Sequence, residues 1–223
     1  MADWFYHPGA AIVGAIARVA FRVAVEGTEN VPRTGAFVLV ANHCSYLDPP
    51  ILGWAAGHRI GRVIHFMAKA EMGSWPVLGW LATQAGVIYV RRGEADRVAQ
   101  KAALDALSAG LPVALFPEGT RSRDGHLKAG HGGAAYLAMR TGAPIVPVGI
   151  SGTQHIFPGR SRLPRLPKVR VRIGAALHLA HQPAERLDRG ALAVGTEAIM
   201  DAIEALLPED QRRRTPATGS PEG

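Results

Sequence analysis

The sequence predicts a single α/β domain in which a mostly buried mixed sheet is flanked by helices. Short apolar runs alternate along the chain with longer amphipathic segments, the order expected when strands and helices take turns. Several of the runs are apolar at nearly every position, which is typical of strands covered on both faces. The chain has 223 residues, of which 48% are hydrophobic, enough to bury one sizeable core.

In the first half of the chain, each predicted element is set by the turn residues around it. An apolar segment ending near Arg18 reads as a helix, and Arg18–Glu26 alternates well enough to be a strand. Ala36–Ala41 is expected to be a buried strand, and Pro49 fits the first turn of the helix that follows. Further on we expect strands at Ile64–Ala68 and Gly86–Val90, with a short helix at Pro76–Thr83 between them.

In the second half, glycines mark the ends of the helices. Glu94–Ser108 has acidic residues early and Gly110 after it, as a helix requires. Val169–Ile173 alternates strictly, so we expect a strand with one solvated face. The remaining elements are strands at Pro112–Phe116 and Ala143–Ile150 and helices at Gly130–Arg140 and Ala184–Leu207.

Three parts are expected along the chain. Residues 1–18 form an amphipathic membrane-docking segment, residues 19–207 form the α/β domain, and the polar residues 208–223 form a disordered tail. No stretch reaches the ~20 apolar residues of a spanning helix, so any membrane association is expected to be peripheral. No basic region precedes the first apolar segment, which argues against a cleaved signal peptide.

The N-terminal segment has the composition of an interfacial anchor. Aromatic residues cluster at Trp4–Tyr6, the segment stays uncharged to Ala17, and Arg18 and Arg22 follow. An apolar helix with aromatic and basic neighbours suits the boundary between lipid headgroups and acyl chains. A first helix packed on the core fits the same pattern equally well.

Charge and cysteine content narrow the class of partner. The chain carries a net charge of +7 and a sequence pI near 10.2. This favours an anionic partner such as a phosphate-bearing substrate or an anionic membrane surface. Nucleic acid fits least, because no aromatic residues interleave with a basic stripe. The lone Cys44 excludes an internal disulfide and a cysteine-based metal cluster, and suits a reducing, cytosolic compartment.

The stretch Asn42–Asp48 carries a histidine and an aspartate five residues apart. On a regular helix their side chains would point roughly 140° apart and could not pair easily. If Asp48 instead caps the helix that starts at Pro49, His43 lies in irregular backbone and can fold back onto it. The capped amide would be that of Ile51, because prolines have no N–H. The alternative is a helix cap and an unrelated core histidine.

Three predicted strands end on polar residues. The ends are His43 with Asp48, Arg91 with Arg92, and Glu118 with Arg121. In open α/β sheets, ligands bind outside the carboxyl ends of the strands. Arginines there indicate a phosphate-bearing substrate, and a glycine after Glu118 allows close backbone approach. Taken separately, these ends also fit solvated turns, and Glu118 fits either a substrate acceptor or a partner of the arginine.

Four of these segments resemble the signatures of the glycerolipid acyltransferases, the 1-acyl-glycerol-3-phosphate acyltransferase family. They are NHCSYLD at Asn42–Asp48, GVIYVRR at Gly86–Arg92, FPEGTRS at Phe116–Ser122 and APIVPV at Ala143–Val148. The third matches residue for residue, and all four occur in the family's order. In this resemblance the region 19–207 is an acyltransferase domain.

The resemblance implies transfer of a fatty acyl group from acyl-CoA or acyl carrier protein to a lysophospholipid hydroxyl, with no metal or further cofactor. His43 would be the general base and Asp48 would orient its imidazole. The implied ligands of the glycerol phosphate are Lys69, Arg91, Arg92, Glu118, Gly119, Thr120 and Arg121. The fourth motif would line the acyl region. The implied location is the cytoplasmic face of the cell membrane.

Two other functions stay open at this point. One is a thioesterase or lipase that uses Cys44 or Ser45 as nucleophile, although the chain lacks a G-x-S-x-G elbow. The other is a non-catalytic module that binds phosphate at a membrane surface. The sequence also departs from the family after the third motif, where relatives often have a lysine. Here Lys128 is followed by a glycine-rich stretch that contains His131.

Overall fold

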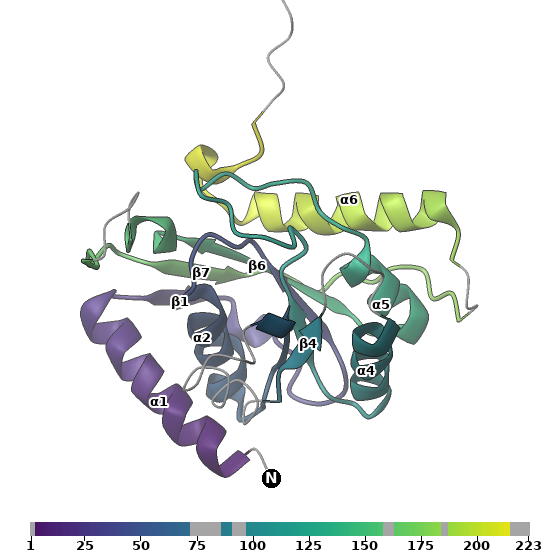
Figure 1. Cartoon of the computed structure of the whole chain (residues 1–223), viewed down its shortest axis with the longest axis horizontal. Coiled ribbons are helices and arrows are strands. Elements are labelled where there is room, and N and C mark those ends of the chain that lie inside the picture. The colour runs from purple at the N-terminus through teal and green to yellow at the C-terminus, as the bar shows by residue number, and fades with distance from the viewer. Residues whose placement is uncertain (1–2, 72–85, 91–96, 158–162, 184–186, 215–223) are drawn as a thin grey trace, which may run out of the picture.

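A seven-stranded sheet forms the centre of the molecule, in the order β1-β7-β6-β2-β5-β3-β4 (Figure 1). The computed structural model describes residues 3–71, 86–90, 97–157, 163–183 and 187–214. The strands are β1 (Ala24–Glu26), β2 (Val38–Ala41), β3 (His65–Lys69), β4 (Ile88–Val90), β5 (Val113–Leu115), β6 (Ile145–Ser151) and β7 (Arg170–Ile173). Neighbouring strands run parallel except β6 and β7, which are antiparallel. The predicted mixed sheet is confirmed.

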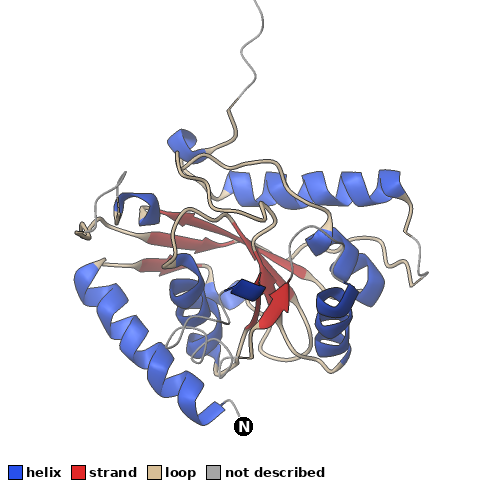
Figure 2. Cartoon of the chain, in the orientation of Figure 1, coloured by secondary structure: helices blue, strands red, loops and turns tan. Residues whose placement is uncertain are grey.

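Helices cover both faces of this sheet (Figure 2). One face packs against α1 (Asp3–Ala20), α2 (Asp48–Leu52) and the π-helical turn Gly53–Gly57. The other packs against α4 (Arg97–Ser108), α5 (Gly133–Thr141) and α6 (Arg189–Ala205). The central strand β2 is buried at every position, with Leu39 in the first core and Val38 in the second. This two-sided burial explains why its sequence is continuously apolar.

The first helix runs two residues further than expected. Arg18–Glu26 was predicted to be a strand, but α1 continues to Ala20 and β1 begins only at Ala24. The helix is held on the core by close packing, because a Cβ at Gly14 would lie 2.1 Å from Nε1 of Trp54. None of the helices in the described part of the chain combines the length and apolar character needed to cross a bilayer.

The C-terminal segment is ordered beyond the point where disorder was predicted. Residues 209–211 form a 3₁₀ turn, and the side chain of Gln211 is buried. Arg213 forms ion pairs with three acidic residues of α6, namely Glu197, Asp201 and Glu204. The expectation of a disordered tail from residue 208 is therefore wrong for residues 209–214. Their polar composition concealed partners that lie on one face of a distant helix.

Candidate active site

The candidate site lies where β2 and β5 end side by side. These strands are parallel neighbours, with Val40 opposite Leu115. The residues that follow them, Asn42–Asp48 and Phe116–Ser122, therefore leave the sheet at the same edge. Asn42 also ties this edge to β6, because its side-chain amide donates to the carbonyl of Ile150 at 2.9 Å and accepts from its N–H at 2.7 Å. No sequence pattern predicts these two hydrogen bonds of Asn42.

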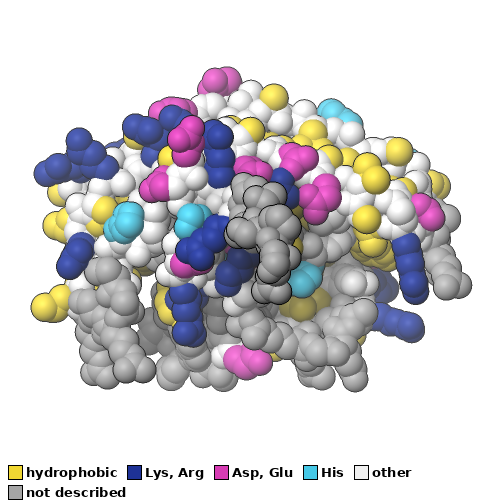
Figure 3. Space-filling view, turned by 90° about the horizontal axis from the view of Figure 1, so that it is seen from above, with side chains coloured by type: hydrophobic (Ala, Val, Ile, Leu, Met, Phe, Trp, Pro, Cys, Tyr) yellow, Lys and Arg dark blue, Asp and Glu magenta, His cyan; other side chains and the backbone are white. Residues whose placement is uncertain are grey.

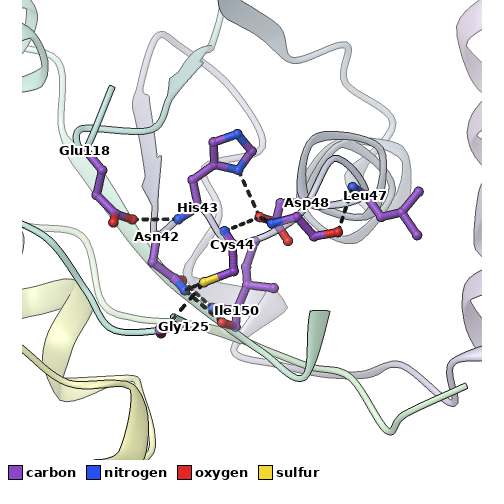
Figure 4. A network of polar contacts seen from close by, with 9 residues as sticks. Asn42, His43, Cys44, Leu47, Asp48, Glu118, Gly125 and Ile150 are labelled. Carbon is purple, nitrogen blue, oxygen red and sulfur yellow. Dashed lines mark hydrogen bonds and ion pairs between the residues drawn. The ribbon is translucent and has the colours of Figure 1, made fainter. Parts of the chain in front are cut away.

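His43 and Asp48 form the pair that their spacing suggested. Nδ1 of His43 lies 2.9 Å from Oδ2 of Asp48, and the aspartate is fully buried. The imidazole stacks on the ring of Phe116, with centroids 4.1 Å apart and an interplanar angle of 18°. Figure 4 shows the second ring nitrogen pointing away from Asp48. A proton on Nδ1, held by the carboxylate, leaves Nε2 as a base.

Asp48 does not cap the helix in the predicted way. Oδ2 accepts the backbone N–H groups of Cys44 and Ser45, both at 2.7 Å, and so binds the turn before the helix. The amide of Ile51, which was expected to be its partner, donates instead to the carbonyl of Leu47 at 3.1 Å. The physical reason is position, since Asp48 is the first residue of α2 and its carboxylate faces back into the turn.

Glu118 holds the backbone on which His43 sits. Its Oε1 accepts the N–H of His43 at 2.7 Å, and its Oε2 accepts the N–H of Lys128 at 3.1 Å. The carbonyl of His43 accepts the N–H of Ser122 at 2.7 Å, so the third motif hydrogen-bonds to both the N–H and the carbonyl of His43. Burial raises the pKa of Glu118 to about 7, although the two backbone hydrogen bonds lower it.

This geometry corrects the expected role of Glu118. A side chain that is 3% exposed and already accepts at both oxygens is poorly placed to contact a substrate hydroxyl. It acts as a positioning residue that joins the ends of β2 and β5. The hydrogen bond depends on the backbone of His43, which no sequence pattern reports.

Residues 119–121 of the third motif form an exposed turn. Gly119 donates its N–H to the carbonyl of Phe116 at 3.0 Å and has a φ of 63°, a conformation that suits glycine. A Cβ at Gly119 would lie 3.0 Å from Cδ2 of His131. His131, which lies in the region where relatives often have a lysine, therefore packs beside this turn. Thr120 is exposed, and the guanidinium of Arg121 lies 3.4 Å from the centroid of the Tyr46 ring.

An open cleft of about 360 Å³ adjoins this turn. Its lining combines residues of the first and third motifs with residues that follow β6. They are Cys44, Ser45, Tyr46, Arg121, Thr153, Gln154 and Phe157. The last three were missed from the sequence, because their loop carries no recognisable pattern and only the strand order brings it beside β2.

The fourth motif does not line this cleft. Ile145, Val146 and Val148 are completely buried, and they divide between the two hydrophobic cores on either side of the sheet. Its expected place beside the acyl chain stays a prediction, because the described residues do not show where that chain would bind. A proline-containing apolar strand at the centre of a covered sheet contributes packing rather than a binding surface.

Three predicted cations cannot be placed at the site. Lys69 ends β3 and pairs in register with Val90 of β4, so its backbone lies on a neighbouring strand. Its side chain, and the whole of Arg91 and Arg92, lie outside the described residues. Their roles stay predictions.

Cys44 lacks the character of a nucleophile. Burial and the nearby carboxylates of Asp48 and Glu118 raise the pKa of its thiol to about 12. Its sulfur lies 3.8 Å from the carbonyl of Gly125. The hydroxyl of Ser45 accepts the N–H of Leu47 at 3.3 Å. Both side chains are thus occupied in local structure, and the geometry disfavours a thioesterase that uses either one.

Comparisons with known proteins agree with the motifs. The sequence model of the Acyltransferase family matches residues 22–151. A lyso-ornithine lipid O-acyltransferase from Pseudomonas aeruginosa is 37% identical over 60% of this chain and 49% of its own length. A chloroplastic 1-acyl-sn-glycerol-3-phosphate acyltransferase from Arabidopsis thaliana is 33% identical over 71% of this chain and 44% of its own length. The chain spans about half the length of these curated relatives.

The fold also has a solved counterpart. The crystal structure of a 1-acyl-sn-glycerophosphate acyltransferase from Thermotoga maritima superimposes with a TM-score of 0.67 at 27% sequence identity. The match covers 88% of this chain and 78% of that one. It therefore extends well beyond the four motifs.

Proposed function

Because the chain belongs to the Acyltransferase family, we propose that it transfers a fatty acyl group from a thioester to the free hydroxyl of a lysophospholipid. 1-Acyl-glycerol-3-phosphate is the acceptor that the motifs favour, and phosphatidic acid would be the product. The observation that carries this proposal is the 2.9 Å pairing of His43 with a buried Asp48 beside the third motif.

The proposed reaction is a direct transfer. Nε2 of His43 takes the proton from the acceptor hydroxyl while its oxygen attacks the carbonyl carbon of the thioester. The C–S bond then breaks, and the thiolate leaves and is protonated by the imidazolium. Asp48 stabilises the positive charge that the His43 ring carries between these two proton transfers. A thiol has a pKa of about 8.5 and leaves readily, so no covalent enzyme intermediate is needed.

The acceptor's phosphate is assigned to the exposed turn. Thr120 is exposed, Arg121 is half-buried beside it, and Gly119 lets a ligand approach the backbone. Lys69, Arg91 and Arg92 are proposed to complete the phosphate site. The donor is acyl-CoA or an acyl carrier protein, and both would present the same thioester.

The acceptor and product are lipids, so we place the protein peripherally at a membrane, on its cytoplasmic face. The outer side of α1 supports this assignment, because it exposes Ile12, Ile16 and Val19 at 63%, 53% and 82%. An apolar helix face of this kind lies in the interface between lipid headgroups and acyl chains. Residues 3–20 are thus the proposed docking segment, which ends two residues later than the sequence suggested.

Product analysis tests the proposal. Purified protein is given an acyl thioester with and without lysophosphatidic acid, and the products are identified by mass spectrometry. We expect thiol release that requires the acceptor and yields phosphatidic acid, and a loss of about 100-fold or more for His43→Ala with lipid binding retained. Free fatty acid formed without an acceptor would indicate a thioesterase. Binding without any turnover would indicate a non-catalytic module.

A further inference from the structure

One wall of the cleft extends into an exposed apolar surface. Thr153, Gln154 and Phe157 follow β6 and line the cleft together with Tyr46 and Arg121. Phe157 is 44% exposed and Tyr46 is 58% exposed, so both rings reach the outside of the molecule. The rim of the cleft therefore carries two aromatic rings beside the guanidinium of Arg121.

The chain returns beside this rim at residues 163–168. The N–H of Arg165 donates to the carbonyl of Ile156 at 2.8 Å, which fixes the returning segment next to Phe157. Leu163 and Leu166 are 79% and 63% exposed. Ile156 itself is fully buried, so the leucines project from an anchored backbone.

The same segment is basic. Arg165 and Lys168 are exposed, and they alternate with the two leucines in the sequence Leu-Pro-Arg-Leu-Pro-Lys. Arg and Lys side chains gather over the left half of Figure 3, the half where Figure 1 places β1, β7 and the end of α1. An anionic surface complements this half of the molecule.

The apolar surface also adjoins the proposed docking helix. Phe21, which follows α1 directly, forms a small core with Ile156 and Val169, and Ala20 packs against it. The exposed face of α1 therefore ends close to the backbone that carries Phe157.

We propose that Phe157, Leu163 and Leu166, with Arg165 and Lys168, form a second contact with an anionic bilayer, which seats the mouth of the cleft on the lipid surface. This inference rests on the proposed function, because a lysophospholipid acceptor resides in the bilayer and must reach Arg121 with little exposure of its acyl chain to water. Leucines would enter the headgroup boundary, and the two cations would lie among anionic headgroups.

Sedimentation with vesicles tests this contact without requiring turnover. Leu163→Ser/Leu166→Ser is compared with wild type on phosphatidylcholine–phosphatidylglycerol vesicles. We expect association to weaken about tenfold or more from the lost apolar burial. Val98→Ser/Val194→Ser is the matched control, because these valines are 80% and 72% exposed on α4 and α6, and it should bind as wild type does. Equal binding of the leucine variant and this control would overturn the proposal.

A second pair of variants tests the charge. Arg165→Gln/Lys168→Gln should weaken binding about tenfold on the anionic vesicles and leave binding to pure phosphatidylcholine vesicles unchanged. An equal loss on both compositions, or no loss on the anionic one, would contradict the assignment of these cations to anionic headgroups.

An activity arm separates this inference from the proposed function. With a short-chain acceptor dissolved as monomers, the leucine variant should turn over as wild type does, which also shows that it is folded. With the acceptor in vesicles its apparent KM should rise about tenfold. Failure of wild type to turn over either acceptor would count against the acyltransferase proposal, while the vesicle-binding comparison still decides the second contact.

Discussion

The backbone N–H of His43 donates to Oε1 of Glu118 at 2.7 Å, across 75 residues of sequence. The proposed general base is therefore held by a carboxylate of the third motif as well as by Asp48. Because the second oxygen of Glu118 binds the N–H of Lys128, one buried side chain ties together the ends of two strands and the loop that follows.

Replacing Glu118 with glutamine should disturb the position of His43 while leaving phosphate binding largely intact. An amide has one acceptor oxygen and one donor nitrogen, so only one of the two backbone N–H groups stays satisfied. We expect a loss of about 1–3 kcal/mol in the free energy of unfolding and a larger fall in kcat than rise in KM. Urea unfolding and steady-state kinetics measure both. A variant that raises the acceptor's KM alone would instead make Glu118 a substrate ligand.

The same residue predicts a pH dependence of stability. Its pKa rises from the ordinary 4.5 to about 7 in the folded protein, so between these values the folded state binds more protons than the unfolded state. Stability contributed by this group should therefore fall as the pH rises from about 4.5 to 7 and stay level above. The difference between wild type and Glu118→Gln in unfolding experiments isolates this contribution. A difference that does not change with pH across the window would contradict it.

Cys44 should resist alkylation in the folded protein. A thiol with a pKa of about 12 carries almost no thiolate near pH 8, and only the thiolate reacts. We expect iodoacetamide to leave native Cys44 unmodified and to label it after unfolding in guanidinium chloride, as read by intact mass. Glutathione in the same tube shows that the reagent is active. Rapid labelling of the native protein would instead support a thioesterase that uses Cys44 as its nucleophile.

Arg121→Ala should weaken acceptor binding. Charge-assisted hydrogen bonds to phosphate contribute about 1.5–3 kcal/mol each, so we expect the acceptor's KM to rise about 10- to 100-fold with a smaller change in kcat. Arg123→Ala, two residues further and exposed, is the control for loss of charge in the same loop. Identical KM values for the two variants would remove Arg121 from the phosphate site.

Much of the fold was predictable because burial on both faces of the sheet leaves a local pattern. The apolar run before Asn42 and the alternation in β7 both report which side of the strand is covered. The His43–Asp48 pair was also predictable, because both residues lie within one turn. The roles of Glu118 and Phe157 were not, since each depends on a partner brought close only by strand order. The order of strands in a sheet leaves no periodic trace in the sequence.

The C-terminal segment is connected to the candidate site through the loop that contains Leu127 and Lys128. Arg213 binds acidic residues on α6, chiefly Glu204, and these hydrogen bonds raise its pKa. Gln211, two residues earlier, accepts the N–H of Leu127 at 2.8 Å through its carbonyl and lies 3.5 Å from the carbonyl of Gly125 through its side-chain amide. Lys128, the residue after Leu127, donates its N–H to Glu118. The C-terminal segment thus holds in place the loop whose Lys128 amide binds Glu118.

Arg213→Ala should therefore act at the site from a distance. We expect a loss of about 1–3 kcal/mol in the free energy of unfolding, since the partly buried hydrogen bonds between Arg213 and Glu204 are broken together with its exposed ion pairs. Hydrogen exchange at the amides of Leu127 and Lys128 should accelerate, and kcat should fall more than KM rises. Lys101→Ala, which removes an exposed ion pair with Asp105 on α4, should change stability by less than about 1 kcal/mol. Unchanged exchange at Leu127 in the Arg213 variant would show that the segment does not fasten this loop.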